Sequence, residues 1–389
     1  MEKEIYIVSA VRTAIGGMLG VYSDTSSTDL GGVVLEAAME RASKAAGPAE
    51  AVIMGCVLSA GLGQAPARQA ALKAGLPVHV PCDTLNKMCG SGMESVIIAH
   101  NAITSGRYNV MLAGGMENMT RAPYLMLKGR SGYRLGNQTL YDHMFIDGLE
   151  DPYDHQSMGY YADETAKAKN ISRDEQDKFA EASLRRAQDA IQTGAFIKEI
   201  TPVIIQKKSG SMIVSADEIP LNLKPEKIGI LKPAFSANGT VTAANSSSIA
   251  DGAAALMLAD RDHLTERALA KICGYACVAQ DPAWFTLAPI AAIESVLTKL
   301  NWRVEDVDLF EINEAFAVVP LAAMQALDIP HEKLNVNGGA CALGHPIGAS
   351  GARILVTLIH ALKARHLKRG IAALCIAGGE ACAMAIELV

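Results

Sequence analysis

The sequence predicts an α/β protein built from two similar halves. At 389 residues the chain is too long for one hydrophobic core. Short apolar runs typical of strands alternate with helical segments. The second half also repeats the first: VEDVDLFEINEAFAVVPLAAMQALDIP parallels AEAVIMGCVLSAGLGQAPARQAALKAGLP, LGHPIGASGARILVTLIHAL parallels NKMCGSGMESVIIAHNAI, and LCIAGGEACAMAIEL parallels VMLAGGMENM. Two α/β halves related by pseudo-symmetry follow from this repeat.

Each element of the first half has its own sequence signal. A buried strand is typically a short apolar run, and glycine or proline ends a helix. On these grounds we expect strands at 5–10, 51–57 and 108–113, and helices at 28–46 and 64–74, the first of which ends at Gly47-Pro48. The core pattern resumes at Ile249.

Residues 117–248 interrupt this regular pattern, because Met, Tyr, Arg and Asp become frequent there. One strong helix is expected at 172–193, opened by the capping pattern S-R-D-E. We interpret the segment as a large excursion that covers a site or makes subunit contacts; a passive surface insertion is the alternative.

Composition excludes several classes of protein. Half of the residues are hydrophobic and 34 are glycine, which argues against disorder. A net charge of −6 gives no general attraction to nucleic acid or to an anionic membrane. Eight dispersed cysteines form neither a CxxC zinc pattern nor a disulfide framework, so we expect no metal. With no leader and no apolar run of membrane-spanning length, we expect a cytoplasmic protein.

The stretch DTLNKMCGSGME, residues 83–94, indicates a reactive cysteine. It reads as a strand end, a tight turn with Cys89 at its apex, and then a helix. Gly90 and Gly92 allow backbone angles and close approaches that larger residues resist. Cys89 would lie at the positive end of the helix, where a thiolate is stabilised. An inert buried cysteine is the alternative, although it would not need a GSG turn.

The repeat supplies partners for Cys89. It places His345, in GHPIGASG, at the equivalent helix start, facing Cys89. Cys375 ends the last strand, and Asn313 follows a strand in NEAF. A histidine can deprotonate a cysteine, a second cysteine suits proton transfer at carbon, and glycine-turn N–H groups can hold a thioester oxyanion. Taken singly, His345 could be a core histidine and Cys375 a strand cysteine.

Seven segments, in this order, resemble the thiolase family, and in particular its acetyl-CoA acetyltransferases: VRTAIGG, GQAPARQAA, NKMCGSGMES, AGGMENMTRAPY, GTVTAANSS, INEAFA and NGGACALGHPIGASGAR. The resemblance covers essentially the whole chain. It implies two αβα halves in a layered αβαβα sandwich, with an inserted loop domain that binds coenzyme A. The N-terminal half would comprise residues 1–118 and 249–268, and the C-terminal half residues 269–389. The loop domain would comprise residues 119–248. Family members are dimers or tetramers.

The resemblance also implies roles for these residues. Cys89 would become acylated, His345 would activate it, and Asn313 would hold a water in the same oxyanion hole. Cys375 would move the proton at the substrate α-carbon. The N–H groups of Cys89 and Ala377 would form a second oxyanion hole. The implied reaction is a ping-pong condensation of two acetyl-CoA to acetoacetyl-CoA and CoA, or its reverse, with CoA as cosubstrate and no permanently bound cofactor.

The resemblance also implies which residues contact CoA. Ser247 would contact the pantetheine arm, Met158 and Phe235 would line the tunnel, and Ser157 and Ala244 would belong to the same binding region. Ser157 and Leu221 depart from the family pattern, which has His in H-M-G and Arg in D-E-H-P-R. A broader 3-ketoacyl-CoA thiolase is therefore an alternative. A ketosynthase would lack Cys375, and an inactive CoA- or lipid-binding relative would lack a catalytic residue.

Overall fold

A computed structural model describes residues 3–207 and 210–389 of the chain. Residues 1–2 and 208–209, which belong to the predicted first half and loop domain, lie outside the described residues. In the first half the elements are β1 (Ile5–Arg12), β2 (Gly16–Gly17), α1 (Ser27–Ala42), β3 (Ala51–Gly55), α2 (Pro66–Lys73), β4 (Cys82–Leu85), α3 (Ser91–Thr104), β5 (Val110–Asn118) and β10 (Ala250–Asp260).

The second half repeats this order, as predicted. Its main elements are β11 (Ala270–Ala279), α7 (Ala288–Leu300), β12 (Leu309–Ile312), α8 (Val318–Leu327), α9 (Ala340–Leu343), α10 (Ile347–Ala364), β13 (Arg369–Ile376) and β14 (Glu380–Leu388). Short 3-10 turns connect them at η4 (Arg261–His263), η5 (Pro282–Leu287), η6 (Val304–Asp306) and η7 (His331–Lys333).

Sheet topology shows the pseudo-symmetry directly. The strand order is β12-β13-β14-β11-β1-β10-β5-β3-β4. In each half one strand pairs parallel on one side and antiparallel on the other: β5 with β3 and β10, and β13 with β12 and β14. The halves join through a short antiparallel contact, Tyr6 opposite Lys271 and Ile7 opposite Ala270. The order therefore reads nearly the same from either side of this junction.

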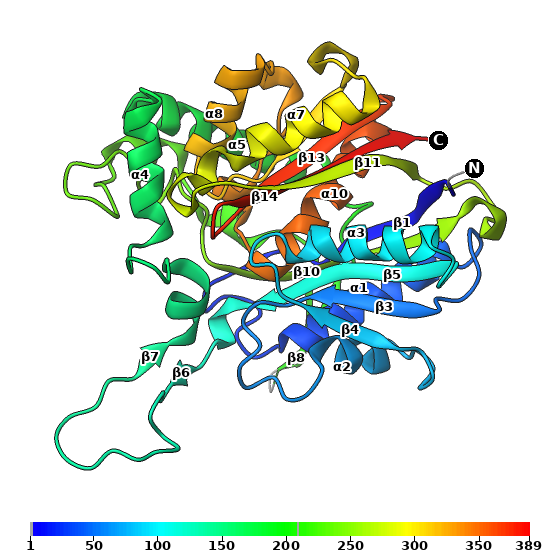
Figure 1. Cartoon of the computed structure of the whole chain (residues 1–389), viewed down its shortest axis with the longest axis horizontal. Helices are drawn as coiled ribbons and strands as arrows, with labels where there is room; N and C mark the ends of the chain where they lie inside the picture. Colours follow the sequence, from blue (N-terminus) through cyan, green and yellow to red (C-terminus); the bar gives the residue numbers. More distant parts are fainter. Residues whose placement is uncertain (1–2, 208–209) are drawn as a thin grey trace.

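Helices α3 and α10 lie between the two halves of the sheet, while α7 covers one outer face and α1 with α2 cover the other (Figure 1). This is the five-layered αβαβα arrangement. The two central helices touch closely, since a Cβ atom on Gly92 would lie 2.6 Å from the backbone nitrogen of Ala352. Helix α10 has the length and hydropathy of a membrane span, but 83% of its apolar stretch is buried inside the fold. The continuous helical segment 282–300, made of η5 and α7, has a similar length and hydropathy, and 44% of it is buried.

The glycine turns differ in detail from the prediction. Gly90 has a φ of −76°, and the left-handed residue of the Cys89 turn is Met88, with a φ of +46°. Gly90 is instead required by space, because a Cβ atom there would lie 2.4 Å from Ile376 Cδ1. The two AGG motifs also diverge: Gly114 continues inside β5, whereas Gly378 turns the β13–β14 hairpin at a φ of +94°. Pairing with β10 keeps β5 extended to Asn118.

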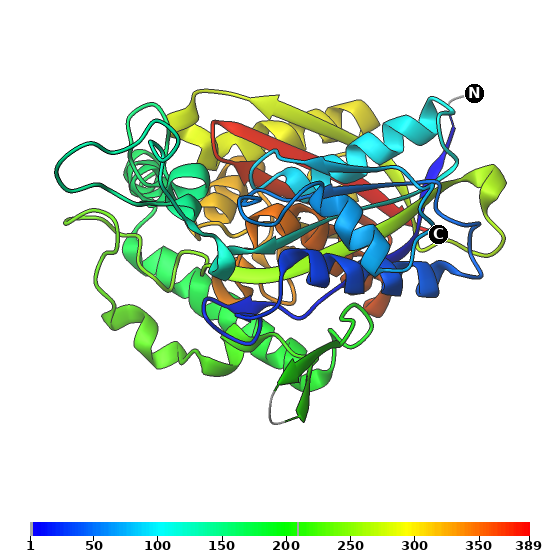
Figure 2. The same cartoon turned by 90° about the horizontal axis from the view of Figure 1, so that it is seen from below.

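The segment 119–248 wraps one side of the core, as Figure 2 shows in green. Its elements are η1 (Met119–Arg121), β6 (Tyr124–Leu125), β7 (Tyr141–Asp142), the π-helical turn η2 (Phe145–Leu149), α4 (Met158–Ala168), α5 (Arg173–Thr193), β8 (Val203–Lys207), β9 (Gly210–Val214), α6 (Glu218–Asn222) and η3 (Pro225–Ile230). Ser172 and Glu175 form the predicted capping box of α5. The predicted helix at 28–46 ends earlier, at Ala42.

A buried ion network anchors this segment to the core. The Arg12 guanidinium, at the end of β1, donates to the Glu199 carboxylate at 2.6 Å and to both Asp217 oxygens at 2.7 and 2.9 Å. All three side chains are fully buried. Because removing one partner would leave an uncompensated buried charge, the network fixes where the segment lies over the core. The position of the cavity walls described below depends on this anchoring.

Candidate active site

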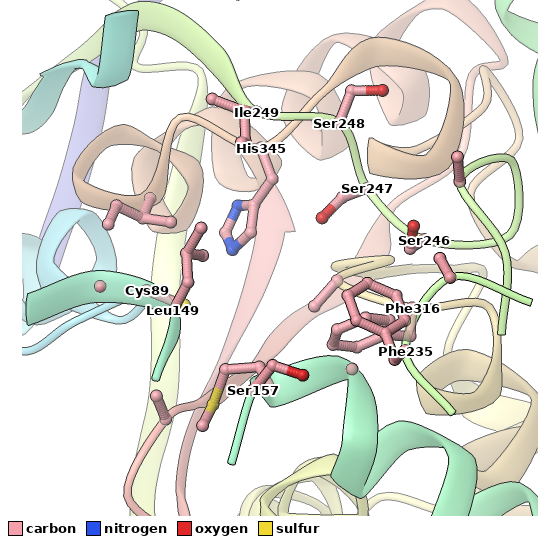
Figure 3. Close-up of a pocket in the computed structure, with 18 of the residues that line it drawn as sticks. Cys89, Leu149, Ser157, Phe235, Ser246, Ser247, Ser248, Ile249, Phe316 and His345 are labelled. Carbon is pink, nitrogen blue, oxygen red and sulfur yellow. The ribbon is translucent and has the colours of Figure 1, made fainter. Parts of the chain in front are cut away.

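A cavity of about 540 Å³ opens where both halves meet the inserted segment (Figure 3). Its walls are mostly apolar, and few polar groups point into it. From the central layers come Cys89, His345, Ile347 and Ala377. The inserted segment and the loops beside it contribute Phe145, Leu149, Ser157, Met158, Phe235, Ser246, Ser247 and Ser248. An apolar cavity with a few convergent polar groups is the usual form of a small-molecule site.

Cys89 lies at the inner end of the cavity, immediately before α3. The backbone N–H groups of Ala377 and of Cys89 itself act on its sulfur in the direction that favours the thiolate. Burial raises the pKa of the thiol to about 11, and these N–H groups only partly offset the effect. Cys89 is therefore a protonated thiol near neutral pH. The two N–H groups converge on one point and can hold an oxyanion there.

His345 projects into the cavity from the turn between α9 and α10 (Figure 3). Its Nδ1 lies 2.5 Å from Ser350 Oγ, and that hydroxyl donates to the Pro346 carbonyl at 3.0 Å. With the hydroxyl proton directed to Pro346, Nδ1 carries the imidazole proton and donates to Ser350 Oγ. Nε2 then has a free lone pair, and it has no partner among the described residues. Burial and the Arg353 charge lower the pKa of His345 to about 3.

Cys375 and Asn313 are buried and do not line the cavity. Cys375 is fully buried at the end of β13, opposite Ala381 of β14. Burial raises the pKa of its thiol well above the usual range, and a negative charge on Cys89 raises it further, so the two sulfurs interact. Asn313 accepts from the Arg353 guanidinium at 3.5 Å, while its Nδ2 has no partner within residues 3–207 and 210–389. A free amide donor of this kind can bind a water molecule.

Comparison with known proteins agrees with this arrangement. Residues 5–262 match the N-terminal domain of thiolase, and residues 266–388 match its C-terminal domain. The chain belongs to the thiolase family. It is 49% identical to the acetyl-CoA acetyltransferase of Escherichia coli and 46% identical to that of Cupriavidus necator, with 99% of each chain covered.

Solved structures show the same fold. The acetyl-CoA acetyltransferase of Bacillus anthracis superposes with a TM-score of 0.96 at 39% identity, covering 100% of this chain and 99% of that one. The Acat5 thiolase of Ascaris suum, solved in complex with coenzyme A, gives 0.92 at 40% identity and covers both chains fully. The thiolase fold predicted from the motifs is thus confirmed.

One buried carboxylate of this thiolase escaped the sequence prediction. Glu117, in β5, accepts from the backbone N–H groups of Val57 at 3.0 Å, Leu58 at 3.2 Å and Gly348 at 3.0 Å. It therefore joins the first half to the start of α10, three residues after His345. Burial raises the pKa of Glu117 to about 7. A glutamate inside the otherwise apolar strand VMLAGGMEN was the available signal.

The residues predicted to face CoA fall into two groups in this thiolase. Met158, Phe235, Ser247 and Ser157 line the cavity. Ser157 caps α4, where its hydroxyl accepts from the Tyr160 N–H at 3.4 Å. Ala244 instead lines a separate, smaller cavity beside α5, and Leu221 is 60% exposed on α6. The binding roles of all these residues remain predictions.

Proposed function

We propose that the chain is an acetyl-CoA C-acetyltransferase, which condenses two acetyl-CoA to acetoacetyl-CoA and CoA and catalyses the reverse thiolysis. One observation carries the proposal: a single cavity is lined by the Cys89 thiol, by Ala377 and by an imidazole whose Nε2 has no partner among the described residues, and the buried Cys375 thiol is close enough to respond to a charge on Cys89. The names of the similar enzymes support the choice of acetyl-CoA.

The first half-reaction is acyl transfer to sulfur. Because the Cys89 thiol is protonated at rest, its proton passes to Nε2 of His345 as the sulfur attacks the thioester carbonyl. The N–H groups of Cys89 and Ala377 stabilise the oxyanion. When the C–S bond to CoA breaks, the proton on His345 goes to the departing CoA sulfur. Acetyl-Cys89 and free CoA result.

The second half-reaction needs a base at carbon, and Cys375 is the remaining titratable candidate. Burial is the main cause of the raised pKa of Cys375, and a charge on Cys89 would raise it further, so a neutral acetyl-Cys89 leaves burial as the main cost of forming the Cys375 thiolate. Cys375 first releases its thiol proton to solvent, and its thiolate then takes the α-proton of a second acetyl-CoA, whose carbanion attacks acetyl-Cys89. The C–S bond to Cys89 breaks, the departing Cys89 thiolate takes the α-proton from Cys375, and the Cys375 thiolate regains a proton from solvent. We propose that a water bound by Asn313 Nδ2 donates to the second thioester oxygen, and that Nε2 of His345 helps to bind that oxygen when it carries a proton.

A broader 3-ketoacyl-CoA thiolase is the second candidate, and Ser157 favours it. A serine at the mouth of an apolar cavity leaves more room for an acyl chain than the histidine found in the resembling acetoacetyl-CoA-specific members. We expect kcat/KM for thiolysis to be highest for acetoacetyl-CoA and to fall as the 3-ketoacyl chain lengthens. Equal or rising values for chains of eight carbons and more would favour the second candidate.

Subunit association belongs to the same proposal. β4 and β12 are the two edge strands of the sheet, but β12 is buried whereas β4 is largely exposed, and exposed edge strands invite pairing with a second copy. The β6–β7 arm extends away from the core (Figure 1) and exposes Tyr124, Met126, Leu127, Leu135, Leu140 and Tyr141. We propose that a dimer forms through β4 and that the arms join dimers into a tetramer, working in the cytoplasm. Light scattering of a chain with Leu127→Ser and Leu135→Ser should then report a dimer.

The direct test of the activity uses purified protein, acetoacetyl-CoA and CoA. Thiolysis should consume both substrates and release two acetyl-CoA. Mass spectrometry after acetyl-CoA alone should find an acetyl group on the Cys89 peptide, and Cys89→Ser should show neither turnover nor label. A label confined to Cys375 would contradict the assignment of the nucleophile.

A further inference from the structure

A second group of thiols lies outside the catalytic residues, on paired strands of the second half. Cys277 of β11 and Cys382 of β14 stand directly opposite one another in the antiparallel register. Glu94, in the first turn of α3, points at both. Its Oε2 lies 3.4 Å from Cys277 Sγ and 3.7 Å from Cys382 Sγ. All three ligand atoms fall within 4.8 Å of one another.

The two sulfur–oxygen separations match those between ligands of one zinc ion, and the two sulfurs lie within 4.8 Å of each other. With Zn–S near 2.3 Å and Zn–O near 2.0 Å, tetrahedral angles place a sulfur and an oxygen about 3.5 Å apart and two sulfurs about 3.8 Å apart. The observed S···O distances, 3.4 and 3.7 Å, lie on either side of the first value. No large side-chain movement is needed to bring the three atoms onto one ion.

The ligand types select the class of ion. Two thiolates favour zinc and related soft divalent cations, whereas magnesium and calcium prefer sites made only of oxygen. Cys277 is exposed, so the ion has a path from solvent and a water can take the fourth position. Cys382 and Glu94 are more enclosed and fix the inner side of the site.

The groups around Cys382 set the protonation state of its thiol. Lys87 pairs with Glu380, at the start of β14. In the absence of an ion, the hydrogen bond with Cys277, burial and the Glu94 charge raise the pKa of the Cys382 thiol, and the Lys87 charge opposes them, so the ion must displace the thiol proton when it binds. Binding would release the two thiol protons to solvent.

We propose that Cys277, Cys382 and Glu94 form a binding site for a zinc-class divalent cation. The site is separate from the cavity, which it does not line. It would link β11 and β14 to the helix that begins next to Cys89. The chain supplies no sequence spacing for this site, because the ligands come from three elements far apart in the sequence.

Cobalt is the probe for the test, because thiolate ligation of Co²⁺ produces a charge-transfer absorption band that oxygen ligation does not. The full chain carries Cys89→Ser, which removes the catalytic thiol as a competing ligand. After reduction, and with free thiols counted, Co²⁺ should bind at one ion per chain with that band. Zn²⁺ should displace it, and protons should be released on binding.

Substitutions of the proposed ligands test whether these three residues bind the ion. Cys277→Ser and Glu94→Gln should each raise the Kd for Co²⁺ by at least about tenfold, and Cys277→Ser should weaken the thiolate band. Cys273→Ser is the matched control on the same strand and should bind as the parent does. Circular dichroism shows that each variant is folded. Absence of binding by the fully reduced parent, or binding that is unchanged in Cys277→Ser, would overturn the site.

Discussion

Ser350 Oγ lies 2.5 Å from Nδ1 of His345 and donates its own proton to the Pro346 carbonyl. This pair of contacts determines which imidazole nitrogen is free. With its proton directed to Pro346, the hydroxyl accepts from the imidazole, so in this arrangement Nδ1 is protonated and Nε2 is the base. Ser350 is thus a positioning residue for the step in which Cys89 loses its proton.

Ser350→Ala should slow acetylation of Cys89 by at least about tenfold, because His345 loses the contact that fixes its tautomer. Ser95→Ala is the matched control. Ser95 is a buried serine on the facing helix α3, and its hydroxyl bonds only to the Gly92 and Gly114 carbonyls. Both variants should lose similar unfolding free energy, and only Ser350→Ala should lose acetylation rate, as measured by rapid quenching. Equal rates in the two variants would mean that Ser350 has a structural role alone.

Cys89 should react with iodoacetamide as a protonated thiol. Burial raises its pKa to about 11 and lowers that of His345 to about 3, so the resting pair is neutral. We expect the alkylation rate to keep rising between about pH 7 and 10, beyond the pKa of an ordinary cysteine. Cys89→Ser identifies the signal that belongs to this residue. A rate that is already level near pH 6 would indicate a thiolate–imidazolium pair instead.

Glu117→Gln should destabilise the fold in a pH-dependent way. Its amide cannot accept from all three N–H groups, and one unsatisfied buried donor costs about 1–3 kcal/mol. In the wild type the folded pKa is about 7 against 4.5 unfolded, so the folded state holds more protons between these values. Wild-type stability therefore falls as pH rises through this window, by about 1.4 kcal/mol per unit of pKa difference.

The glutamine variant has no such titration, so its stability deficit should be largest near pH 5 and should narrow toward pH 7. Urea unfolding at several pH values measures this difference. A deficit that widens as pH rises would show that Glu117 is ionised throughout, with a lowered pKa.

Ser247→Ala should raise the KM for CoA with little effect on acetylation of Cys89 at saturating acetyl-CoA. The Ser247 side chain points into the cavity (Figure 3), while its backbone N–H is held by the Ala315 carbonyl at 2.9 Å. Ser246→Ala is the comparison, because the Ser246 hydroxyl is already bonded to the Thr242 carbonyl at 2.7 Å. Initial-rate kinetics should show the larger KM for Ser247→Ala, and an unchanged KM would count against contact with CoA.

The repeat made most of the fold predictable. It implied equivalent helices after Cys89 and beside His345, and α3 and α10 do lie together at the centre. The backbone conformation at individual turns could not be predicted as well, because it depends on contacts with residues that are distant in the sequence. Gly90 is needed to make room for Ile376, and the AGG motif of β5 stays extended because β10 pairs with it.

The same limit applies to the site. A lone cysteine and histidine in glycine turns gave a local signal for Cys89 and His345. Glu117 contacts residues from two other segments, and Glu94 of helix α3 contacts cysteines on two strands, so neither has a recognisable spacing. Ala244, which was grouped with the cavity residues through the AANSS segment, faces a separate cavity because the chain turns there.

Proton exchange at the α-carbon of acetyl-CoA tests the division of labour between the two catalytic cysteines most directly. The enzyme and acetyl-CoA are incubated in deuterated water, and mass spectrometry follows both acetylation of Cys89 and deuterium in the acetyl methyl group. We predict that wild type shows both, and that Cys375→Ala is still acetylated but exchanges slower by a factor of about 10² to 10⁴. Exchange at the wild-type rate in acetylated Cys375→Ala would contradict the account and place the base elsewhere.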